Sequence, residues 1–252
     1  MICDAHVHMG YYARTGYNSP YYYSPRRVLG VLNRCGVSEF IVSSTCSQID
    51  SISIDEIMRE AVEMKRIAGN RAHIFFWLSW HLYQEDKRMS WLDSGLFEGV
   101  KFHELETQWV TRKEKTLNKI LERINERGMS VMFHCGRSEG CCPFDLRQIA
   151  RRYPKMHFNF AHCAPMREME EVMRECANVW TDTAYLSDND FTKAPCFDWQ
   201  NRLMFGTDLP VWQGHERCYL TAKYRKYLLN WRKVFGDLDA MLAFNSFLHI
   251  HQ

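Results

Sequence analysis

Near its start the sequence carries two histidines one residue apart, in Asp4-Ala5-His6-Val7-His8. Side chains alternate across a β-strand, so both imidazoles would project from one face, and Asp4 would share that face one step deeper. Two imidazoles on one face form half of a metal site, and a carboxylate beside them can orient ligands or water. The H-x-H spacing alone is a weak signal, because such a pair is often an ordinary polar pair.

Further polar residues stand at the ends of later apolar runs. His134 and His162 each end such a run, and Asp208 closes the last one. On another run, Lys101 and His103 share the parity that faces inward. If these runs are the parallel strands of one barrel, their carboxyl ends meet at a single rim, where the active sites of such barrels form. The sequence therefore predicts a metal centre at that rim.

Other side chains after the strands suggest a substrate pocket. Arg137, three residues past His134, could receive a carboxylate bidentately, although a surface arginine is an equal alternative. Trp212 and His215 follow the last strand and are plausible pocket residues. Several tyrosines crowd the loop after the first strand, where they could wall a pocket for a flat compound or simply pack on the rim: Tyr11, Tyr12, Tyr17, Tyr21, Tyr22 and Tyr23.

Short apolar runs alternate with longer helical segments along the whole chain. The expected strands are Ile2–His8, Glu39–Thr45, Ala72–Trp80, Phe97–His103, Met129–Cys135, Met156–Cys163, Asn178–Ala184 and Arg202–Asp208. The expected helices are Pro25–Cys35, Ile54–Ala68, Lys115–Arg127, Pro143–Tyr153, Met166–Cys176 and Glu216–Phe235. Eight such units without a linker or composition break predict an α/β protein, a single (β/α)₈ TIM barrel spanning residues 1–252. A doubly wound open sheet is the rival architecture.

Composition limits the cellular setting and the partners. The 32 Lys and Arg against 30 Asp and Glu give a net charge of +2, so no strong field favours nucleic acid or a membrane surface. The 10 cysteines contain no C-x-x-C pair and do not form a disulfide framework, which fits a reducing compartment. No apolar run approaches the ~20 residues of a membrane span. We expect a cytoplasmic enzyme without nucleic-acid or membrane partners that acts on a small molecule and possibly forms a homo-oligomer.

The order and strand placement of these residues resemble the amidohydrolase superfamily, in particular the amidohydrolase-related (amidohydrolase 2) branch that includes aminocarboxymuconate-semialdehyde decarboxylase and related metal-dependent hydrolases. The resemblance implies one divalent ion, commonly zinc, held by the positions that match His6, His8, His134 and Asp208. It also implies that His162 acts on the activated water or the substrate. Either His162 or Asp208 could accept the remaining proton as a catalytic base.

Lys101 and His103 are ambiguous within this resemblance. In binuclear members of the superfamily, a carboxylated lysine on the fourth strand bridges two metals. The alternative is a lysine that pairs with a carboxylate or meets an anionic substrate, which we favour because the nearer branch usually holds one metal. His103 is either a substrate contact or a satisfied polar residue.

The leading expectation is a metal-dependent hydrolase of a small cyclic or carboxylated compound, which uses a metal-activated water. A non-oxidative decarboxylase on the same site is the close alternative. A phosphoesterase or DNase of the related histidine-rich barrels is disfavoured, because the DNase-like group has a glutamate where this chain has Lys101, and because the charge is balanced. A catalytically silent barrel that serves as a binding module is a further alternative, from another class of function.

Overall fold

A computed structural model describes residues 2–12, 21–210, 220–235 and 238–249 of the chain. Its centre is one curled sheet of nine strands in the order β2-β1-β3-β4-β5-β6-β7-β8-β9. All neighbouring strands are parallel except for the short β2, which pairs antiparallel with the end of β1. The strands are β1 Cys3–Tyr12, β2 Tyr21–Tyr23, β3 Glu39–Ser44, β4 Ala72–Trp77, β5 Gly99–Phe102, β6 Ser130–Phe133, β7 Phe158–Phe160, β8 Val179–Asp182 and β9 Leu203–Met204.

The two ends of the parallel row are joined by a seam between β1 and residues 205–209. Three main-chain hydrogen bonds cross it: Ala5 N to Phe205 O at 2.7 Å, His8 N to Leu209 O at 2.6 Å and Asp208 N to His6 O at 2.8 Å. A single bridge pairs Val7 with Leu209. The predicted alternation of parallel strands and helices is confirmed. In the described residues the seam consists of these contacts rather than a regular β9–β1 ladder, because β9 is only two residues long.

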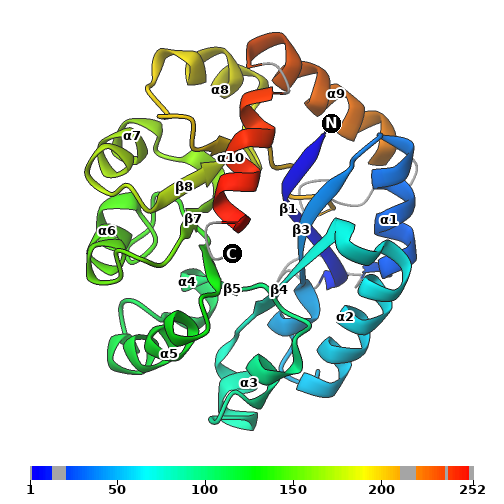
Figure 1. Cartoon of the computed structure of the whole chain (residues 1–252), viewed down its shortest axis with the longest axis vertical. Coiled ribbons are helices and arrows are strands. Elements are labelled where there is room, and N and C mark those ends of the chain that lie inside the picture. The colour runs from blue at the N-terminus through cyan, green and yellow to red at the C-terminus, as the bar shows by residue number, and fades with distance from the viewer. Residues whose placement is uncertain (1, 13–20, 211–219, 236–237, 250–252) are drawn as a thin grey trace.

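Helices surround the strands on the outside of the curled sheet (Figure 1). They are α1 Pro25–Arg34, α2 Ile54–Ala68, α3 Trp80–Glu85, α4 Glu104–Thr107, α5 Glu114–Glu126, α6 Pro143–Arg152, α7 Met166–Glu175, α8 Asp188–Lys193 and α9 Leu220–Val234, whereas α10 Leu238–His249, described below, lies elsewhere. Their apolar faces pack against the outward-facing side chains of the strands in one continuous core. The N-terminus of α1 follows from local chemistry, because Ser24 Oγ accepts from Arg27 N at 3.3 Å and Pro25 opens the helix.

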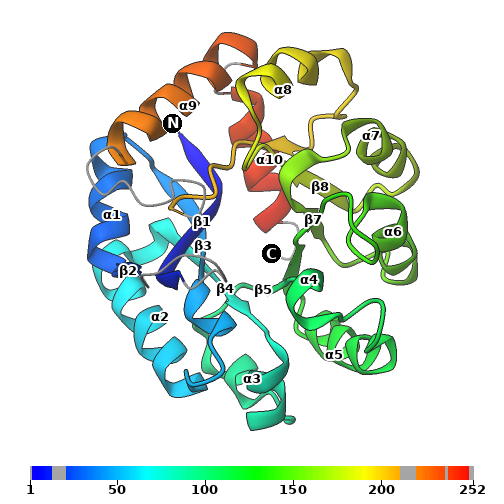
Figure 2. The ribbon, with the colours of Figure 1, turned by 180° about the vertical axis from the view of Figure 1, so that it is seen from behind.

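The last helix covers the amino end of the strand ring, and it occupies the middle of the ring in both opposite views (Figures 1 and 2). Its Ala243, Phe244 and Phe247 are fully buried among inward-facing residues of the strands, such as Phe75 and Trp180. His157 Nδ1 and Ser130 Oγ lie 3.0 and 3.3 Å from the carbonyl oxygen of Phe247. Helix α10 therefore plugs the end of the sheet that lies opposite the candidate site.

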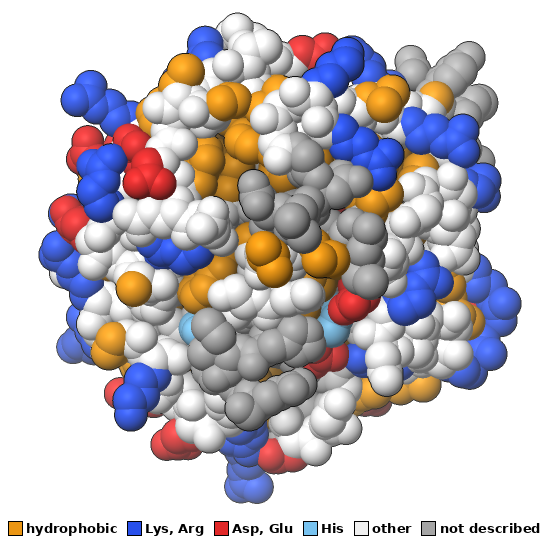
Figure 3. All heavy atoms as spheres, turned by 45° about the horizontal axis from the view of Figure 1, so that its top comes forward, with side chains coloured by type: hydrophobic (Ala, Val, Ile, Leu, Met, Phe, Trp, Pro, Cys, Tyr) orange, Lys and Arg blue, Asp and Glu red, His pale blue; other side chains and the backbone are white. Residues whose placement is uncertain are grey.

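Several elements were not predicted as such. The tyrosine-rich stretch contains β2, and the short helices α3, α4 and α8 follow strands that the sequence pattern made longer. On the face drawn in Figure 3, basic and acidic side chains lie interspersed over the outer helices. No described helix is both long and apolar enough to cross a membrane. The cysteines in the described part of the chain are all free, as expected.

Candidate active site

Strand β1 brings His6 and His8 to the carboxyl edge of the sheet, where the segment after β9 delivers Asp208. All three side chains are at least nine-tenths buried. Asp208 Oδ1 lies 3.0 Å from His8 Nε2 and 3.5 Å from His6 Nε2. One ligand atom from each residue lies within 4.8 Å of the other two. Two imidazoles and a carboxylate are donors that suit zinc and similar divalent ions, so these residues fit the metal that the sequence implied.

Charge and burial keep these donors in the form that binds a cation. Burial and the nearby charge of Lys101 lower the pKa of His8 to about 3. Burial opposes ionisation of Asp208, but its hydrogen bond with His8 and the neighbouring imidazoles outweigh burial and lower its pKa. At neutral pH, His8 is therefore a neutral imidazole and Asp208 is a carboxylate. His8 Nδ1 lies 2.9 Å from Ser43 Oγ, which holds the ring from the far side.

Lys101 points inward from β5, as its parity predicted, and is 1% exposed. Its Nζ lies 2.6 Å from His6 Nε2 and 3.1 Å from His8 Nε2, and 4.5 Å from the centroid of the Trp77 ring. Burial lowers the pKa of Lys101 to about 8, against the opposing effect of Asp208 and Asp182. The ammonium occupies the space beside these two ring nitrogens that a metal ion would use, so the two compete.

His134 and His162 form a pair on the same wall, outside the group of three donors. His162 Nδ1 lies 3.1 Å from the carbonyl oxygen of Ala184, which can only accept, so Nδ1 carries the proton. His162 Nε2 then accepts from His134 Nδ1, 2.9 Å away. Burial lowers the pKa of His162 to about 4 and that of His134 well below its ordinary value, so both rings are neutral. The sequence grouped His134 with the ligands, whereas here it is bonded to the proposed base.

His103 lies between two flat neighbours. Its ring stacks on His134 with centroids 4.0 Å apart and on Trp77 at 5.6 Å. Its Nδ1 is buried and has no hydrogen-bond partner among the described residues. Burial and the charge of Lys101 lower the pKa of His103 well below its ordinary value.

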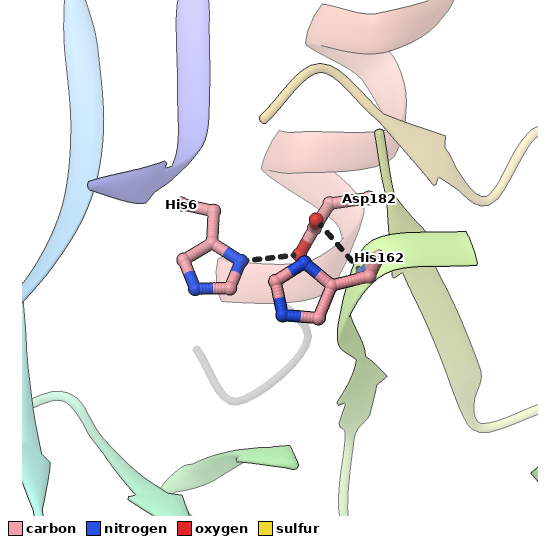
Figure 4. A group of neighbouring side chains, drawn as sticks. All are labelled: His6, His162 and Asp182. Atoms are coloured by element: carbon pink, nitrogen blue, oxygen red, sulfur yellow. Dashed lines mark hydrogen bonds and ion pairs between the residues drawn. The ribbon is translucent and has the colours of Figure 1, made fainter. Parts of the chain in front are cut away.

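Two buried carboxylates, Asp182 and Asp4, support the site from behind. Asp182, which ends β8, accepts hydrogen bonds from His6, Asn159 and main-chain groups (Figure 4). Asp4 accepts from His6 N at 3.1 Å, from Thr207 Oγ1 at 2.7 Å and from Tyr224 Oη at 2.8 Å. Sequence reasoning assigned Asp4 an orienting role but did not single out Asp182, although Asp182 is an acid at a strand end, as Asp208 is.

The loop after β6 carries Arg137 to the edge of the cavity, where it is exposed. Glu104 anchors this region from below, because its carboxylate accepts from Val110 N at 2.7 Å and from Thr111 Oγ1 at 2.6 Å. Gly140 packs so closely on these residues that a Cβ there would lie 2.7 Å from Glu104 Oε1 and 2.6 Å from Thr111 Cγ2.

One cavity of about 1130 Å³ opens over these side chains. Most of the expected site residues line it, and they are joined by an outer part that the sequence did not foresee, which includes Trp80, His81, Lys113 and Tyr185. The expected site residues that line it are His8, Lys101, His103, His134, Arg137, His162 and Asp208. Trp212, His215 and Tyr17 lie outside the described residues.

This combination, a curled parallel sheet with histidines and an aspartate at its carboxyl edge, is typical of TIM-barrel-like enzymes. The profile of the Amidohydrolase family (Amidohydro_2) matches residues 55–230, more than half of the chain. The protein therefore belongs to the amidohydrolase family and is an enzyme, as the sequence predicted. No curated protein matches the sequence.

Solved structures share the fold at low sequence identity. A probable 2-pyrone-4,6-dicarboxylic acid hydrolase from Acinetobacter baumannii, with citric acid bound, superposes with a TM-score of 0.68 at 10% identity, covering 98% of both chains. IDCase from Metarhizium anisopliae gives 0.64 at 12%, covering 100% of this chain and 97% of the other. Dihydroorotase from Saccharomyces cerevisiae, in complex with 5-fluoroorotic acid, gives 0.62 at 14%, covering 99% and 82%.

Proposed function

We propose that the protein is a metal-dependent hydrolase of a small cyclic or carboxylated compound, with one divalent ion, zinc, held by His6, His8 and Asp208. The observation that carries the proposal is the convergence of these three donors beside one cavity, whose lining includes His8 and Asp208. We keep His134 as the candidate fourth ligand, because it lines the same cavity and its Nε2 has no hydrogen bond to a described residue.

A bound divalent ion would act as a Lewis acid, which lowers the pKa of water and polarises a carbonyl group. The protein side chains then handle the proton. Asp208 accepts it at a carboxylate oxygen. In the alternative in which His134 does not ligate the ion, His134 accepts it at Nε2 while its Nδ1 proton moves to His162 Nε2. His162 can hold that charge because its own Nδ1–H points at the Ala184 carbonyl.

The substrate class rests on the cations of the cavity and on the structural relatives. Lys101 at the floor and Arg137 at the edge can each receive a carboxylate, and His103 and Trp212 are proposed to contact the rest of the substrate. Two of the similar structures are described with carboxylic acids, citric acid in one and 5-fluoroorotic acid in the other. A small carboxylated compound fits both observations.

Decarboxylation is the second candidate, because the buried ammonium of Lys101 stands beside the proposed metal ligands. An ammonium there could hold a substrate carboxylate next to the ion, which is the arrangement that loss of carbon dioxide needs. In hydrolysis, the ester or amide group that is cleaved would occupy that position next to the ion instead. The two reactions are separated by their products.

The decisive experiment combines metal analysis with a substrate panel. Purified protein should hold close to one zinc per chain and should hydrolyse at least one member of a panel of lactones and cyclic amides with carboxylate groups. Chelation should abolish the activity, and added zinc should restore it. Release of carbon dioxide from carboxylated aromatics without ring opening would favour the decarboxylase. A protein that binds no divalent ion at any pH would refute the proposal.

The remaining expectations are proposals as well. We propose that residues 1–252 form one domain, that the seam closes a complete (β/α)₈ barrel, and that the enzyme works in the cytoplasm and can form a homo-oligomer. The free cysteines of the described part agree with a reducing compartment.

A further inference from the structure

We infer that Asp182 is a positioning residue that fixes His6 as its Nδ1–H tautomer, so that the Nε2 lone pair of His6 faces the candidate metal centre. The inference deepens the proposed function, on which its relevance rests. The tautomer itself is a property of the metal-free protein and can be measured there.

The contacts at both ends of the His6 ring agree on this tautomer. Its Nδ1 lies 3.1 Å from Asp182 Oδ2, and a carboxylate oxygen can only accept, so Nδ1 must donate. Its Nε2 lies 2.6 Å from Lys101 Nζ, which is a donor, so Nε2 accepts. A histidine that ligates a metal usually donates its other ring nitrogen to a carboxylate in this way, which fixes the ring and raises its basicity.

Asp182 is fully buried, and four N–H groups occupy its two oxygens. Oδ2 accepts from His6 Nδ1 and from Asn159 Nδ2 at 2.7 Å. Oδ1 accepts from the main-chain nitrogens of His162 at 3.2 Å and Ala184 at 3.0 Å. Figure 4 shows the carboxylate between the two rings, with His6 bonded through its side chain and His162 through its backbone.

This arrangement decides between two interpretations of the cluster. His6, His162 and Asp182 lie close enough together to hold a cation. With four donors already pointing at its oxygens, Asp182 has no lone pair directed at an ion, and His6 meets it with a proton rather than a free nitrogen. The cluster is therefore a support for two site histidines and not a second metal centre.

The same geometry predicts the effect of Asp182→Asn. The two main-chain N–H groups on the Oδ1 side cannot reverse, so the amide oxygen must face them and the NH₂ group must face His6 and Asn159. Asn159 can turn, since its own Oδ1 is buried without a partner among the described residues. His6 can meet an NH₂ donor only by moving its proton to Nε2, which gives up the hydrogen bond from Lys101 Nζ. This is the outcome known for isosteric Asp→Asn changes beside catalytic histidines.

The test reads the tautomer directly by long-range ¹H–¹⁵N NMR of the metal-free protein labelled at histidine nitrogens, with the His6 signals assigned by comparison with His6→Gln. We expect the Nδ1–H pattern for His6 in the native protein and the Nε2–H pattern in Asp182→Asn. Zinc titration should show unchanged stoichiometry with binding weaker by roughly 10–100-fold. Asp188→Asn, the same change at an exposed position, is the control and should alter neither.

Two results would overturn the inference. One is an Nε2–H pattern for His6 in the native protein, which needs no variant and so does not depend on whether Asp182→Asn folds. The other is a native protein that binds two zinc ions per chain and an Asp182→Asn variant that binds one, which would make Asp182 a ligand of a second ion. Failure of the proposed function looks different, because a native protein that binds no zinc can still show the Nδ1–H tautomer.

Discussion

Lys101 places its ammonium between the two imidazoles that the proposed ion would use, at 2.6 and 3.1 Å from their Nε2 atoms. The sequence left open whether this lysine is a bridging carboxylated ligand or an ordinary cation. If Lys101 is a carboxylated ligand, its removal should weaken metal binding. If it is an ordinary cation, its removal should strengthen metal binding.

Lys101→Met should strengthen zinc binding by about tenfold, or about 1.4 kcal/mol, because it removes the cation that competes for the histidine lone pairs. It should also weaken binding of carboxylated substrates. Both are measured by titration of the metal-free protein. Lys113→Met is the matched control, since Lys113 lies 4.9 Å from the ring centroid of Trp80 in the outer cavity. A drop in the number of ions bound per chain would mean that Lys101 is itself a ligand.

The hydrogen bond between His134 and His162 predicts different defects for the two alanine variants. His162→Ala should keep near-stoichiometric zinc but lose turnover by ~10²–10⁴-fold, or ~3–5 kcal/mol of barrier. His134→Ala should lose both metal and activity. Metal content and rate are measured on the same preparations, with His81→Ala from the outer cavity as the control. If His162→Ala lost the ion as readily as His134→Ala, His162 would be a ligand.

Sequence reasoning pointed to most of the candidate site residues but not to the hydrogen bonds between them. The H-x-H pattern and the final aspartate identified His6, His8 and Asp208, because strand parity and the barrel rim constrain where such side chains point. Sequence reasoning did not single out Asp182, because no sequence motif distinguishes a single acid at a strand end as a site residue. The pairing of His134 with His162 depends on the left-handed backbone at His162, φ 76°, which no spacing rule reveals.

At the scale of elements, the loop after β6 depends on close packing of Gly140 against Glu104 and Thr111. Gly140→Ala should destabilise the protein by about 2–4 kcal/mol, because φ is +78° and the new methyl group meets both side chains. It should also raise KM for carboxylated substrates, because Arg137 lies on this loop. Denaturant unfolding and substrate titration measure the two effects.

Gly36→Ala is a matched control for this prediction. Its φ is +73°, but nothing lies within 4 Å of the added Cβ. Its cost should therefore be the backbone term alone, about 1–2 kcal/mol, without an effect on KM. Equal losses in the two variants would show that the packing contact contributes nothing.

His73 on β4 joins three neighbouring segments of the sheet. Its Nε2 lies 3.1 Å from Glu39, and its Nδ1 pairs with Glu98. Burial alone would lower the pKa of His73, but the hydrogen bonds and charges of the two glutamates outweigh burial and raise it. This stabilisation is complete below pH 6.5, the ordinary value, and is lost as pH rises through the folded pKa.

His73→Gln should accordingly flatten the decline in unfolding free energy above about pH 6.5. The effect should stay near or below about 1 kcal/mol, because both glutamates are partly exposed and screened by solvent. Chemical unfolding between pH 6 and 9 would measure it. A variant whose curve stays parallel to that of the native protein would exclude this ion pair as the source.

At the scale of the whole molecule, the site imidazoles make the metal-free protein sensitive to acid. His8 and His162 have folded pKa values of about 3 and about 4, below the ordinary value, so the unfolded chain binds more protons as pH falls. Asp4, whose pKa burial raises to about 6, acts in the opposite direction. His103 and His134 act in the same direction as His8 and His162, so the net loss of unfolding free energy from pH 6.5 to 5 should be at least about 2 kcal/mol.

Urea unfolding at the two pH values tests this prediction. Zinc added at the higher pH should raise stability further, because it binds only the folded site. Unchanged stability at pH 5 would mean that the imidazoles are already protonated in the folded protein.

Most of the fold could be predicted from sequence, because buried parallel strands are apolar on both faces and therefore stand out. The parts that escaped lack this signal. Strand β9 has two residues, β2 lies in a run of tyrosines, and α10 is an apolar helix whose place under the sheet depends on tertiary packing. The seam is likewise a product of distant contacts, since Asp4 and Thr207 are 203 positions apart.

The distance in sequence between β1 and the segment after β9 has a consequence for the synthesis of the protein on the ribosome. At ~5–20 residues per second, a ribosome produces His6 and His8 about 10–40 s before it produces Asp208. During this interval the nascent chain offers only two of the three converging donors, and the seam that brings the third has not formed. Copper, which binds exposed imidazoles more tightly than zinc does, meets an incomplete site. The choice of metal is thereby deferred to the finished chain, in which burial and geometry can select it.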